Sequence, residues 1–315
     1  MSQHPQYLWW NGKQMRWEDA TVHVTALGWS TVGAIFEGIR AYWNPDHQEL
    51  YIFRLDEHME RFERSMKLMR LPVTYSMDEL KRAIVDLLRA NDSREDTYIR
   101  PLAYRGGSGQ RRFSETGGTS EILINTHPMP THLLSGRGYS ACVSSWTRIS
   151  DNVMPPRVKN ISNYRNGQLV GMEAELNGYD TALILNTQGK VAEGGGACVM
   201  LVRDGKLITP DVTQSILESI TRDALIVLAR QELGLEVVER AVDRTELYIA
   251  DEVFMCGTAA EITPLTSVDR YTIGNGEIGP ITRKLEELLD DCFHGRSGAR
   301  PNWRTPVGVA AAVAD

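Results

Sequence analysis

The sequence predicts a mixed α/β protein organised as two domains. Its 315 residues are about twice the length of an average domain, and 42% hydrophobic with 24% charged residues is the composition of a globular chain with a large core. Stretches with helical spacing of apolar residues alternate with short β-branched and apolar runs. A segment with two prolines and no periodicity, from Pro128 to Arg137, separates the two halves and is typical of a linker.

Two helices are the clearest local predictions in the first half. Met59, Phe62 and Met66 recur at helical spacing, which places them on one face of a helix over residues 55–71. Ser76 followed by Glu79 has the pattern of a capping box, which predicts a second helix that ends near residue 90. The other elements expected here are strands at 7–10, 97–102 and 121–125, the first followed by an Asn11-Gly12 turn.

The second half contains more strand-like runs than helical ones. Apolar runs separated by turns such as Gln188-Gly189 indicate strands, and Gly234 is placed to stop an amphipathic helix. The expected elements are strands at 181–185, 198–202, 206–209, 236–242 and 252–255 and helices at 220–233 and 277–289. The expected domains are a small N-terminal domain at 1–127, a linker at 128–138, a larger C-terminal domain at 139–293 and a loosely held tail at 294–315.

The composition argues against several classes of partner. A net charge of -7 and a pI near 5.6 argue against nucleic acid, because a nucleic-acid-binding face is basic. No apolar run approaches the roughly 18 residues of a membrane span and no signal-peptide pattern is present, so the expected compartment is the cytoplasm. The 4 cysteines lack CxxC spacing and the 7 histidines lack metal-ligand spacing. We therefore expect reduced, buried thiols and no metal site.

Four short segments carry candidate chemistry. Lys159 lies among apolar and turn residues at 155–164, where shielding from water would favour the neutral, nucleophilic amine. Glu193 is followed by three glycines, which let the backbone approach a flat ring closely. The helix start at 219–223 and the small residues at 256–260 both suit an anion. The first three segments have ordinary alternatives: an exposed lysine, a hairpin turn with a solvated acid, and a plain helix cap.

Together these segments match what pyridoxal 5'-phosphate requires: an amine for its aldehyde, an acid at its pyridine nitrogen, a donor at its ring oxygen and a cradle for its phosphate. Their order resembles that of the class IV, or fold-type IV, aminotransferases. The segments that carry the resemblance are Lys159-x-x-x-Asn163-Tyr164, Glu193-Gly194, Ile220-Thr221-Arg222-Asp223 and the run from Leu247 to Ile262. Phe36-Glu37-Gly38-Ile39-Arg40 and Tyr98-Ile99-Arg100-Pro101 resemble the branched-chain amino-acid aminotransferases in particular, and the similarity covers about residues 7–290.

The resemblance implies a role for each matching residue. Lys159 would bind the cofactor covalently and move a proton between the substrate Cα and the cofactor C4′ carbon. Glu193 would pair with the pyridine nitrogen, and Tyr164 would hydrogen-bond the ring oxygen. The implied phosphate contacts are Arg61, Ile220, Thr221 and the Thr258 hydroxyl. The implied substrate contacts are Tyr98 with the backbone amides of Thr258 and Ala259 for the carboxylate, and Phe36, Gly38, Arg40, Arg100 and Gly196 for the pocket.

The resemblance also implies the reaction and the assembly. The reaction is transamination between an L-branched-chain amino acid and a 2-oxo acid such as 2-oxoglutarate, so the expected partners are a small amino donor and a small acceptor. The implied fold has two α/β domains with the cofactor in the cleft between them. The implied assembly is a homodimer or a hexamer built from dimers.

Several departures from the family pattern concern the substrate. The run Trp29-Ser30-Thr31-Val32-Gly33 stands where branched-chain enzymes usually carry His-Tyr-Gly, Cys198 replaces asparagine or serine, and Ser219 replaces glycine. The loop from Arg105 to Arg112 is unusually basic; either Arg105 or Arg111 meets a substrate carboxylate or the loop is solvated. Two alternatives therefore stay open. One is a same-fold enzyme for D-amino acids, aromatic substrates or (R)-amines, or of the aminodeoxychorismate lyase type, and the other is a non-catalytic binding protein.

Overall fold

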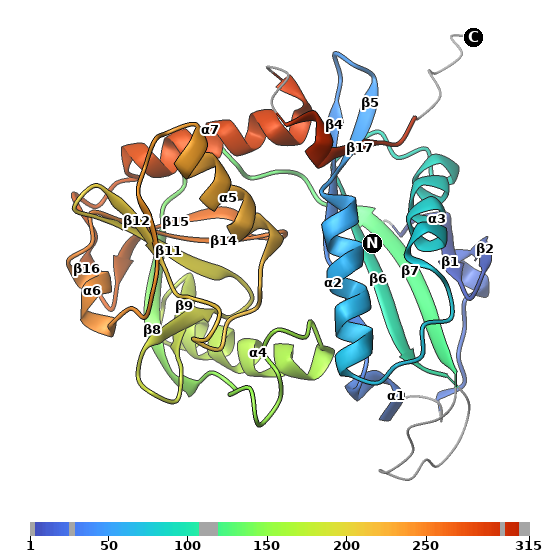
Figure 1. Ribbon diagram of the computed structural model, residues 1–315, viewed down its shortest axis with the longest axis horizontal. Helices are drawn as coiled ribbons and strands as arrows, with labels where there is room; N and C mark the ends of the chain where they lie inside the picture. Colours follow the sequence, from blue (N-terminus) through green and yellow to red (C-terminus); the bar gives the residue numbers. More distant parts are fainter. Residues whose placement is uncertain (1–3, 25–28, 107–118, 297–299, 309–315) are drawn as a thin grey trace. The chain divides into compact units, whose positions relative to one another are not determined.

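The computed structural model describes residues 4–24, 29–106, 119–296 and 300–308 (Figure 1). Contacts divide the chain into two compact units. The first unit comprises Met1–Thr131, Val158–Ser162 and Asp291–Asp315, and the second comprises His132–Arg157 and Asn163–Asp290. Val158–Ser162 therefore belongs to the first unit, although the chain on both sides of it belongs to the second. None of the described helices combines the length and apolarity that a bilayer crossing requires.

The described strands of the first unit form one antiparallel sheet. Its order is β17-β5-β4-β6-β7-β1-β2, and β3 pairs with β6. The strands are β1 (Tyr7–Trp10), β2 (Lys13–Arg16), β3 (Ile35–Phe36), β4 (Ile39–Asn44), β5 (Glu49–Phe53), β6 (Thr97–Arg105), β7 (Ser120–Pro128) and β17 (Arg304–Pro306). The predicted turn is confirmed, because β1 and β2 pair around Asn11 and Gly12, which both have positive φ.

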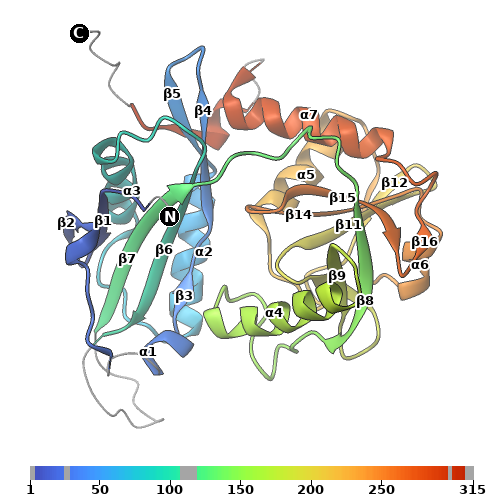
Figure 2. The same ribbon diagram turned by 180° about the vertical axis from the view of Figure 1, so that it is seen from behind.

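Two long helices cover one face of this sheet. The helices of this unit are the short α1 (Trp29–Val32), α2 (Leu55–Leu68) and α3 (Met77–Ala90), with a 3-10 turn at Trp17–Asp19 and another at Pro301–Trp303. Phe62 of α2 and Ile99 of β6 belong to the same hydrophobic core. Helix α2 lies in front of β6 and β7 in Figure 1 and behind them in Figure 2, which is the view from the opposite side. Because side chains alternate along a strand, Tyr98 and Arg100 point to the opposite face. The predicted substrate residues of β6 thus lie on the face that α2 and α3 do not cover.

Local sequence explains where these helices begin and end. The predicted capping box is confirmed: the Glu79 N–H donates to Ser76 Oγ at 3.2 Å, and the Ser76 N–H donates to a Glu79 carboxylate oxygen at 2.8 Å. Helix α2 ends at Leu68, earlier than expected. Arg70 takes a φ of 52°, and a left-handed residue cannot continue a right-handed helix.

The described strands of the second unit form a mixed sheet. Its order is β10-β9-β8-β15-β14-β11-β12-β13, and β16 pairs with β15. The pairs β8 with β9, β8 with β15 and β12 with β13 are parallel. The strands are β8 (Tyr139–Thr147), β9 (Thr181–Leu185), β10 (Val191–Gly194), β11 (Cys198–Arg203), β12 (Lys206–Thr209), β13 (Val237–Glu239), β14 (Glu252–Gly257), β15 (Glu261–Val268) and β16 (Tyr271–Thr272). The strands expected at 181–185 and 206–209 are confirmed with unchanged bounds.

The helices described after β8 are α4 (Ile161–Leu176), α5 (Ile220–Gln231), α6 (Arg244–Tyr248) and α7 (Pro280–His294). Helix α4 was not expected, because its apolar residues show no helical periodicity. Tertiary packing holds it instead: Val170 and Ala174 are buried against Cys142, Ala182 and Ile184 of the neighbouring strands. Helix α5 is confirmed and contacts β14 (Figure 1).

The expectation of a loose tail is corrected for residues 300–308. Strand β17 pairs with β5, with Arg304 opposite Phe53. Trp303 and Val307 are buried, and Arg89 Nε donates to the Val307 carbonyl at 2.6 Å. Residues 304–306 therefore form an edge of the first sheet.

Candidate active site

Lys159 is held in the first unit by backbone hydrogen bonds on both sides of it. Its carbonyl accepts from the Phe36 N–H at 2.9 Å, and the Ile161 N–H donates to the Ala34 carbonyl at 2.9 Å. Lys159 is only 9% exposed, and its Nζ lies 4.9 Å from the centre of the Phe36 ring. Burial favours the neutral amine over the ammonium, and the neutral amine is the form that attacks an aldehyde.

A buried cluster of charges begins one residue after Phe36. Arg61 donates from Nε to one Glu37 carboxylate oxygen and from Nη2 to the other, each at 2.8 Å, and His58 Nδ1 lies 2.9 Å from the second. Burial alone would raise the pKa of Glu37, but the charge of Arg61 and the hydrogen bonds from Arg61 and His58 hold that pKa well below its usual range. Glu37 thereby fixes the guanidinium that the sequence assigns to the phosphate.

Tyr98 and Arg40 face each other on neighbouring strands. They are directly opposite in the register of β4 and β6. A Cβ on Gly38 would lie 2.0 Å from the Tyr98 hydroxyl oxygen, so only glycine leaves room for the phenol there. Three of the predicted substrate residues are thus brought together by one pair of strands.

The two predicted pocket arginines have different surroundings. Arg40 is buried, stacks over the Tyr42 ring at 4.7 Å and donates from Nη2 to the Met129 carbonyl at 2.5 Å. Arg100 is exposed, and its Nε donates to Asn125 Oδ1 at 3.3 Å. Arg40 is therefore fixed in place, whereas the Arg100 side chain is accessible to solvent.

Glu193 of β10 is the second buried carboxylate. One carboxylate oxygen lies 2.8 Å from Arg148 Nη2, and the other accepts from the Leu217 N–H at 2.9 Å. Arg148 is also buried, and its Nε donates to the Ser215 carbonyl at 3.3 Å. A guanidinium and a backbone N–H both favour the charged form of a carboxylate, as a partner for a protonated pyridine nitrogen requires. The sequence reasoning missed Arg148, because no motif surrounds it.

The glycines after Glu193 allow α4 to approach the strand end. A Cβ on Gly167 of α4 would fall 1.8 Å from the Gly195 carbonyl oxygen, which shows that the two backbones are in direct contact. A Cβ on Gly196 would lie 3.7 Å from Cε1 of Tyr164. The second unit thus presents Tyr164 and Glu193, the residues predicted for the ring oxygen and the ring nitrogen, on adjoining segments.

The start of α5 has the features of an anion site. Ser219 is the N-cap, and its hydroxyl accepts from the Arg222 N–H at 3.3 Å. Ile220 and Thr221 are buried in the first turn, where the helix dipole favours negative charge. The Arg222 guanidinium donates to Thr209 Oγ1 at 3.1 Å and so ties the helix to β12.

Thr258 and Ala259 lie at the tip of the hairpin that joins β14 to β15, in which Gly257 pairs with Glu261. A Cβ on Gly257 would lie 3.8 Å from the Gly196 carbonyl oxygen. The hairpin tip therefore adjoins the glycine segment that follows Glu193.

Other predicted features take no part in this arrangement. Arg105 donates to the Arg70 carbonyl at 3.0 Å, and the predicted role of Arg111 falls outside the described residues. The four cysteines are free and buried, as expected. No group of three or more His, Cys, Asp or Glu in the described ranges could hold a metal ion.

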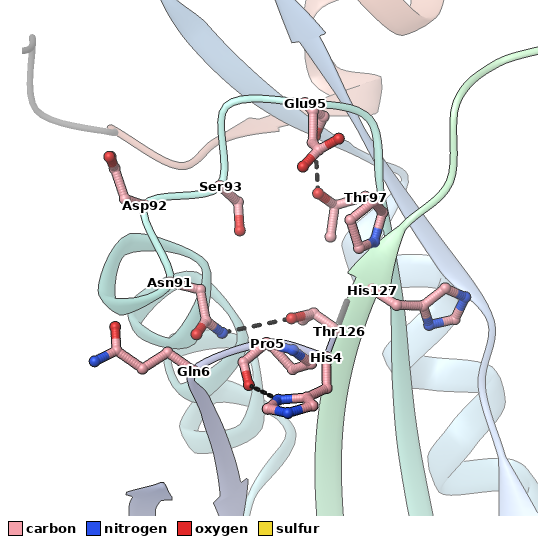
Figure 3. Close-up of a pocket in the computed structure, with 11 residues that line it drawn as sticks. His4, Pro5, Gln6, Asn91, Asp92, Ser93, Glu95, Thr97, Thr126 and His127 are labelled. Atoms are coloured by element: carbon pink, nitrogen blue, oxygen red, sulfur yellow. Dashed lines mark hydrogen bonds between the residues drawn. The ribbon is translucent and has the colours of Figure 1, made fainter. Parts of the chain in front are cut away.

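The cavity of about 190 Å³ in Figure 3 is lined by residues such as Asn91 and His127 and by none of the predicted site residues.

The residues present fit pyridoxal phosphate in two groups, one in each unit. The first unit offers a buried amine, Lys159, and a buried guanidinium, Arg61. The second offers the buried Glu193 carboxylate, the Tyr164 phenol and the first turn of α5. These are the donor types that the cofactor requires.

Known proteins match nearly the whole chain. The family model for amino-transferase class IV matches residues 34–268. The chain is 42% identical over 302 residues to the probable branched-chain-amino-acid aminotransferase of Aquifex aeolicus, covering 96% of each. The crystal structure of the branched-chain amino acid aminotransferase from Thermobaculum terrenum in its PLP form has a TM-score of 0.94 and 55% identity, covering 97% of this chain and 99% of that one. The branched-chain amino acid aminotransferase of T.th., complexed with N-(5'-phosphopyridoxyl)-L-glutamate, has a TM-score of 0.90 and 37% identity, covering 98% of this chain and 100% of that one.

His58→Gln is expected to weaken the pH dependence of stability. Burial lowers the pKa of His58 in the folded chain, so below its ordinary value of about 6.5 the unfolded chain binds a proton that the folded chain does not. Wild-type stability is therefore fully present above that pH and falls as the pH drops below it. Glutamine donates to Glu37 without titrating, so the thermal midpoint should fall less between about pH 7.5 and 5.5. The exposed control His23→Gln should follow the wild type; equal slopes in all three proteins would contradict the prediction.

Arg148→Met is expected to lower the free energy of unfolding by about 3–5 kcal/mol, because it leaves the Glu193 carboxylate buried without its counter-charge. Chemical denaturation measures the loss. Arg157→Met is the matched control, since Arg157 is half-exposed and pairs with Glu218 at 3.3 Å, and its loss should stay below about 1 kcal/mol. Equal, small losses in both variants would show that Glu193 does not depend on Arg148.

Proposed function

Because this chain belongs to the class IV aminotransferases, we propose that it transfers amino groups between the L-branched-chain amino acids leucine, isoleucine and valine and a 2-oxo acid such as 2-oxoglutarate, with pyridoxal 5'-phosphate as cofactor. The observation that carries the proposal is the buried Lys159 amine in a chain that matches named branched-chain enzymes along nearly its whole length. Both substrates are small molecules, and the ligand of one relative, a phosphopyridoxyl adduct of glutamate, corresponds to the 2-oxoglutarate side of such a reaction.

Lys159 is the residue proposed to carry the chemistry. When bound, pyridoxal phosphate supplies an aldehyde for the amino group and a ring that accepts the electron pair left at the substrate Cα. Lys159 binds that aldehyde through its amine and moves a proton between the substrate Cα and the cofactor C4′ carbon. Its side chain is buried, and its Nζ lies 4.9 Å from the centre of the Phe36 ring.

Glu193 holds a proton at the pyridine nitrogen. Its own carboxylate is fixed by Arg148 and by the Leu217 N–H, so the acid is aimed before any ligand arrives. Tyr164 would donate its hydroxyl to the ring oxygen. Removal of the Glu193 carboxylate therefore slows proton transfer at Cα more than it weakens binding.

The residues proposed for the phosphate are Arg61, the first turn of α5 and Thr258. Arg61 supplies the positive charge, with its guanidinium oriented by Glu37. Ile220 and Thr221 supply the first turn of α5, and the Thr258 hydroxyl supplies a further donor. The order of these motifs along the chain supports their assignment to one cofactor.

The substrate carboxylate is held by the Tyr98 hydroxyl and the backbone amides of Thr258 and Ala259. The space beside Gly38 that admits the Tyr98 phenol supports this role. The pocket around the substrate side chain is lined by Phe36, Gly38, Arg40, Arg100 and Gly196. An accessible guanidinium such as that of Arg100 suits the second carboxylate of 2-oxoglutarate.

The proposal includes a cytoplasmic homodimer or a hexamer built from dimers. Four buried, free thiols suit a reducing compartment. The oligomer is supported by the resemblance to the branched-chain aminotransferases.

The wild-type protein incubated with pyridoxal phosphate should be yellow, and Lys159→Ala should lose the visible absorption band of the protein-bound cofactor. The reason is that the proposal assigns the covalent bond to the aldehyde to the buried amine of Lys159. Lys190→Ala is the matched control, because Lys190 pairs with Asp243 at the surface, and it should keep the band. A colourless wild type would favour a non-catalytic binding protein.

Single amino donors test the substrate. L-leucine, L-isoleucine and L-valine should each convert the bound cofactor from its aldehyde to its amine form, which spectrophotometry follows as loss of the yellow colour. The departure at Trp29 to Gly33 favours a second candidate, an enzyme for D-amino acids, aromatic substrates or (R)-amines, or a lyase of the aminodeoxychorismate type. Failure of all three branched-chain donors together with success of a D-amino acid or an (R)-amine would establish that candidate instead.

A further inference from the structure

The hairpin tip that carries Thr258 and Ala259 ends in a strained residue. Gly257 and Glu261 are paired across a three-residue loop, Thr258 to Ala260. Glu261 has a φ of 44°, in the left-handed region. Glycine adopts that conformation readily, whereas a residue with a Cβ is strained there. The glutamate must therefore contribute something that glycine cannot.

The Glu261 carboxylate reaches a distant segment of the second unit. It is completely buried, and its Oε2 accepts from the His132 N–H at 2.8 Å and lies 2.9 Å from His132 Nδ1. His132 comes 129 residues earlier in the chain. Thr263 Oγ1 donates to the Ala260 carbonyl at 2.9 Å on the other side of the loop. Glu261, the first residue of β15 after the loop, is thus anchored through its side chain as well as through its pairing with Gly257.

Charged groups on α7 also face this anchor. Burial raises the pKa of Glu286, and the charge of Glu261 raises it further, while the Leu134 backbone, Arg283 and His132 act in the opposite direction. Burial of a carboxylate is unfavourable, and the contacts with His132 offset that cost. Glu261 therefore combines a left-handed backbone with a desolvated carboxylate, and glycine at this position would avoid both.

We propose that Glu261 is a positioning residue that locks the hairpin tip in the conformation in which Thr258 and Ala259 bind anions. The inference rests on the proposed function, in which this tip binds the substrate carboxylate and the phosphate. The tip is confined on one side, where Gly257 adjoins Gly196, and Glu261 confines the other through His132. N–H donors that are already aimed bind an anion more tightly than mobile ones, because less ordering is needed on binding.

Three variants of the full-length protein separate this role from a purely structural one. Glu261→Gly removes the backbone strain and the anchor together. Glu261→Asn tolerates the left-handed conformation but is one methylene too short to reach His132. Glu261→Gln keeps an acceptor for the His132 N–H and should partly rescue. The control is Asp204→Gly in the turn between β11 and β12, because Asp204 also has a left-handed φ, 52°, and is exposed.

The first readout needs neither cofactor nor substrate. Hydrogen exchange at residues 257–263 should rise about tenfold in Glu261→Gly and Glu261→Asn and stay unchanged in Asp204→Gly. The second readout is kinetic: KM for L-leucine should rise about tenfold with a change in kcat below about threefold, because a binding contact is lost. The affinity of the apoprotein for pyridoxal phosphate should fall in the same variants, since Thr258 also serves the phosphate.

Wild-type exchange, KM and cofactor affinity in Glu261→Gly and Glu261→Asn, with equal or higher thermal stability, would overturn the proposal. If Glu261→Gly does not fold, the same measurements on Glu261→Asn test the proposal. If neither variant folds, the proposal is also overturned, because Glu261 would then be required for folding. Failure of the proposed function has a different signature. The wild type itself would then not bind pyridoxal phosphate or react with amino donors, while the exchange measurement still reports whether the anchor holds the tip.

Discussion

The backbone hydrogen bonds between residues 34–36 and 159–161 are the constraint on which the candidate site depends. The chain on both sides of Val158–Ser162 belongs to the second unit, so no local structure would hold Lys159 beside Phe36 without them. Buried N–H and C=O groups require partners, and the bonds from Phe36 to Lys159 and from Ile161 to Ala34 meet that requirement across a long sequence separation. The location of Lys159 therefore follows from the pairing of main-chain groups.

Three buried carboxylates share one design. Glu37 pairs with Arg61 and His58, Glu193 with Arg148, and Glu261 with His132. Such pairs are weak evidence for added stability, because desolvation of the charges offsets much of their attraction. Each carboxylate either contacts the cofactor in the proposed function or orients a group that does. The acids therefore determine the geometry of the site more than they add to the stability of the fold.

The departures from the family pattern in the second unit are compatible with cofactor binding. Ser219 replaces glycine but caps α5 by accepting from the Arg222 N–H. The Cys198 thiol donates to the Leu217 carbonyl at 3.4 Å, and the N–H of the same Leu217 donates to Glu193. Both residues thus support the segment that leads into the proposed phosphate site. A serine hydroxyl at a helix start can accept from a backbone N–H, which glycine cannot do with a side chain. A small buried thiol fills about the same space as a small polar side chain.

The sequence by itself determined the features that depend on residues close together in the chain. The Asn11-Gly12 turn and the Ser76 capping box arise from contacts within a few residues, and the apolar face of α2 that contains Phe62 follows from the spacing of its residues. The sequence therefore predicts all three without the fold. The motifs around Lys159 and Glu193 identified the family for the same reason.

Only the tertiary structure decided which distant residues meet. It showed that α4 forms without apolar periodicity, because Val170 and Ala174 pack against neighbouring strands, and that β17 pairs with β5 at the edge of the first sheet. It also showed that Arg148 pairs with Glu193 and that Glu37 orients Arg61. The sequence around these residues does not predict such partners. A buried charge pairs with whichever side chain the topology brings within hydrogen-bond distance.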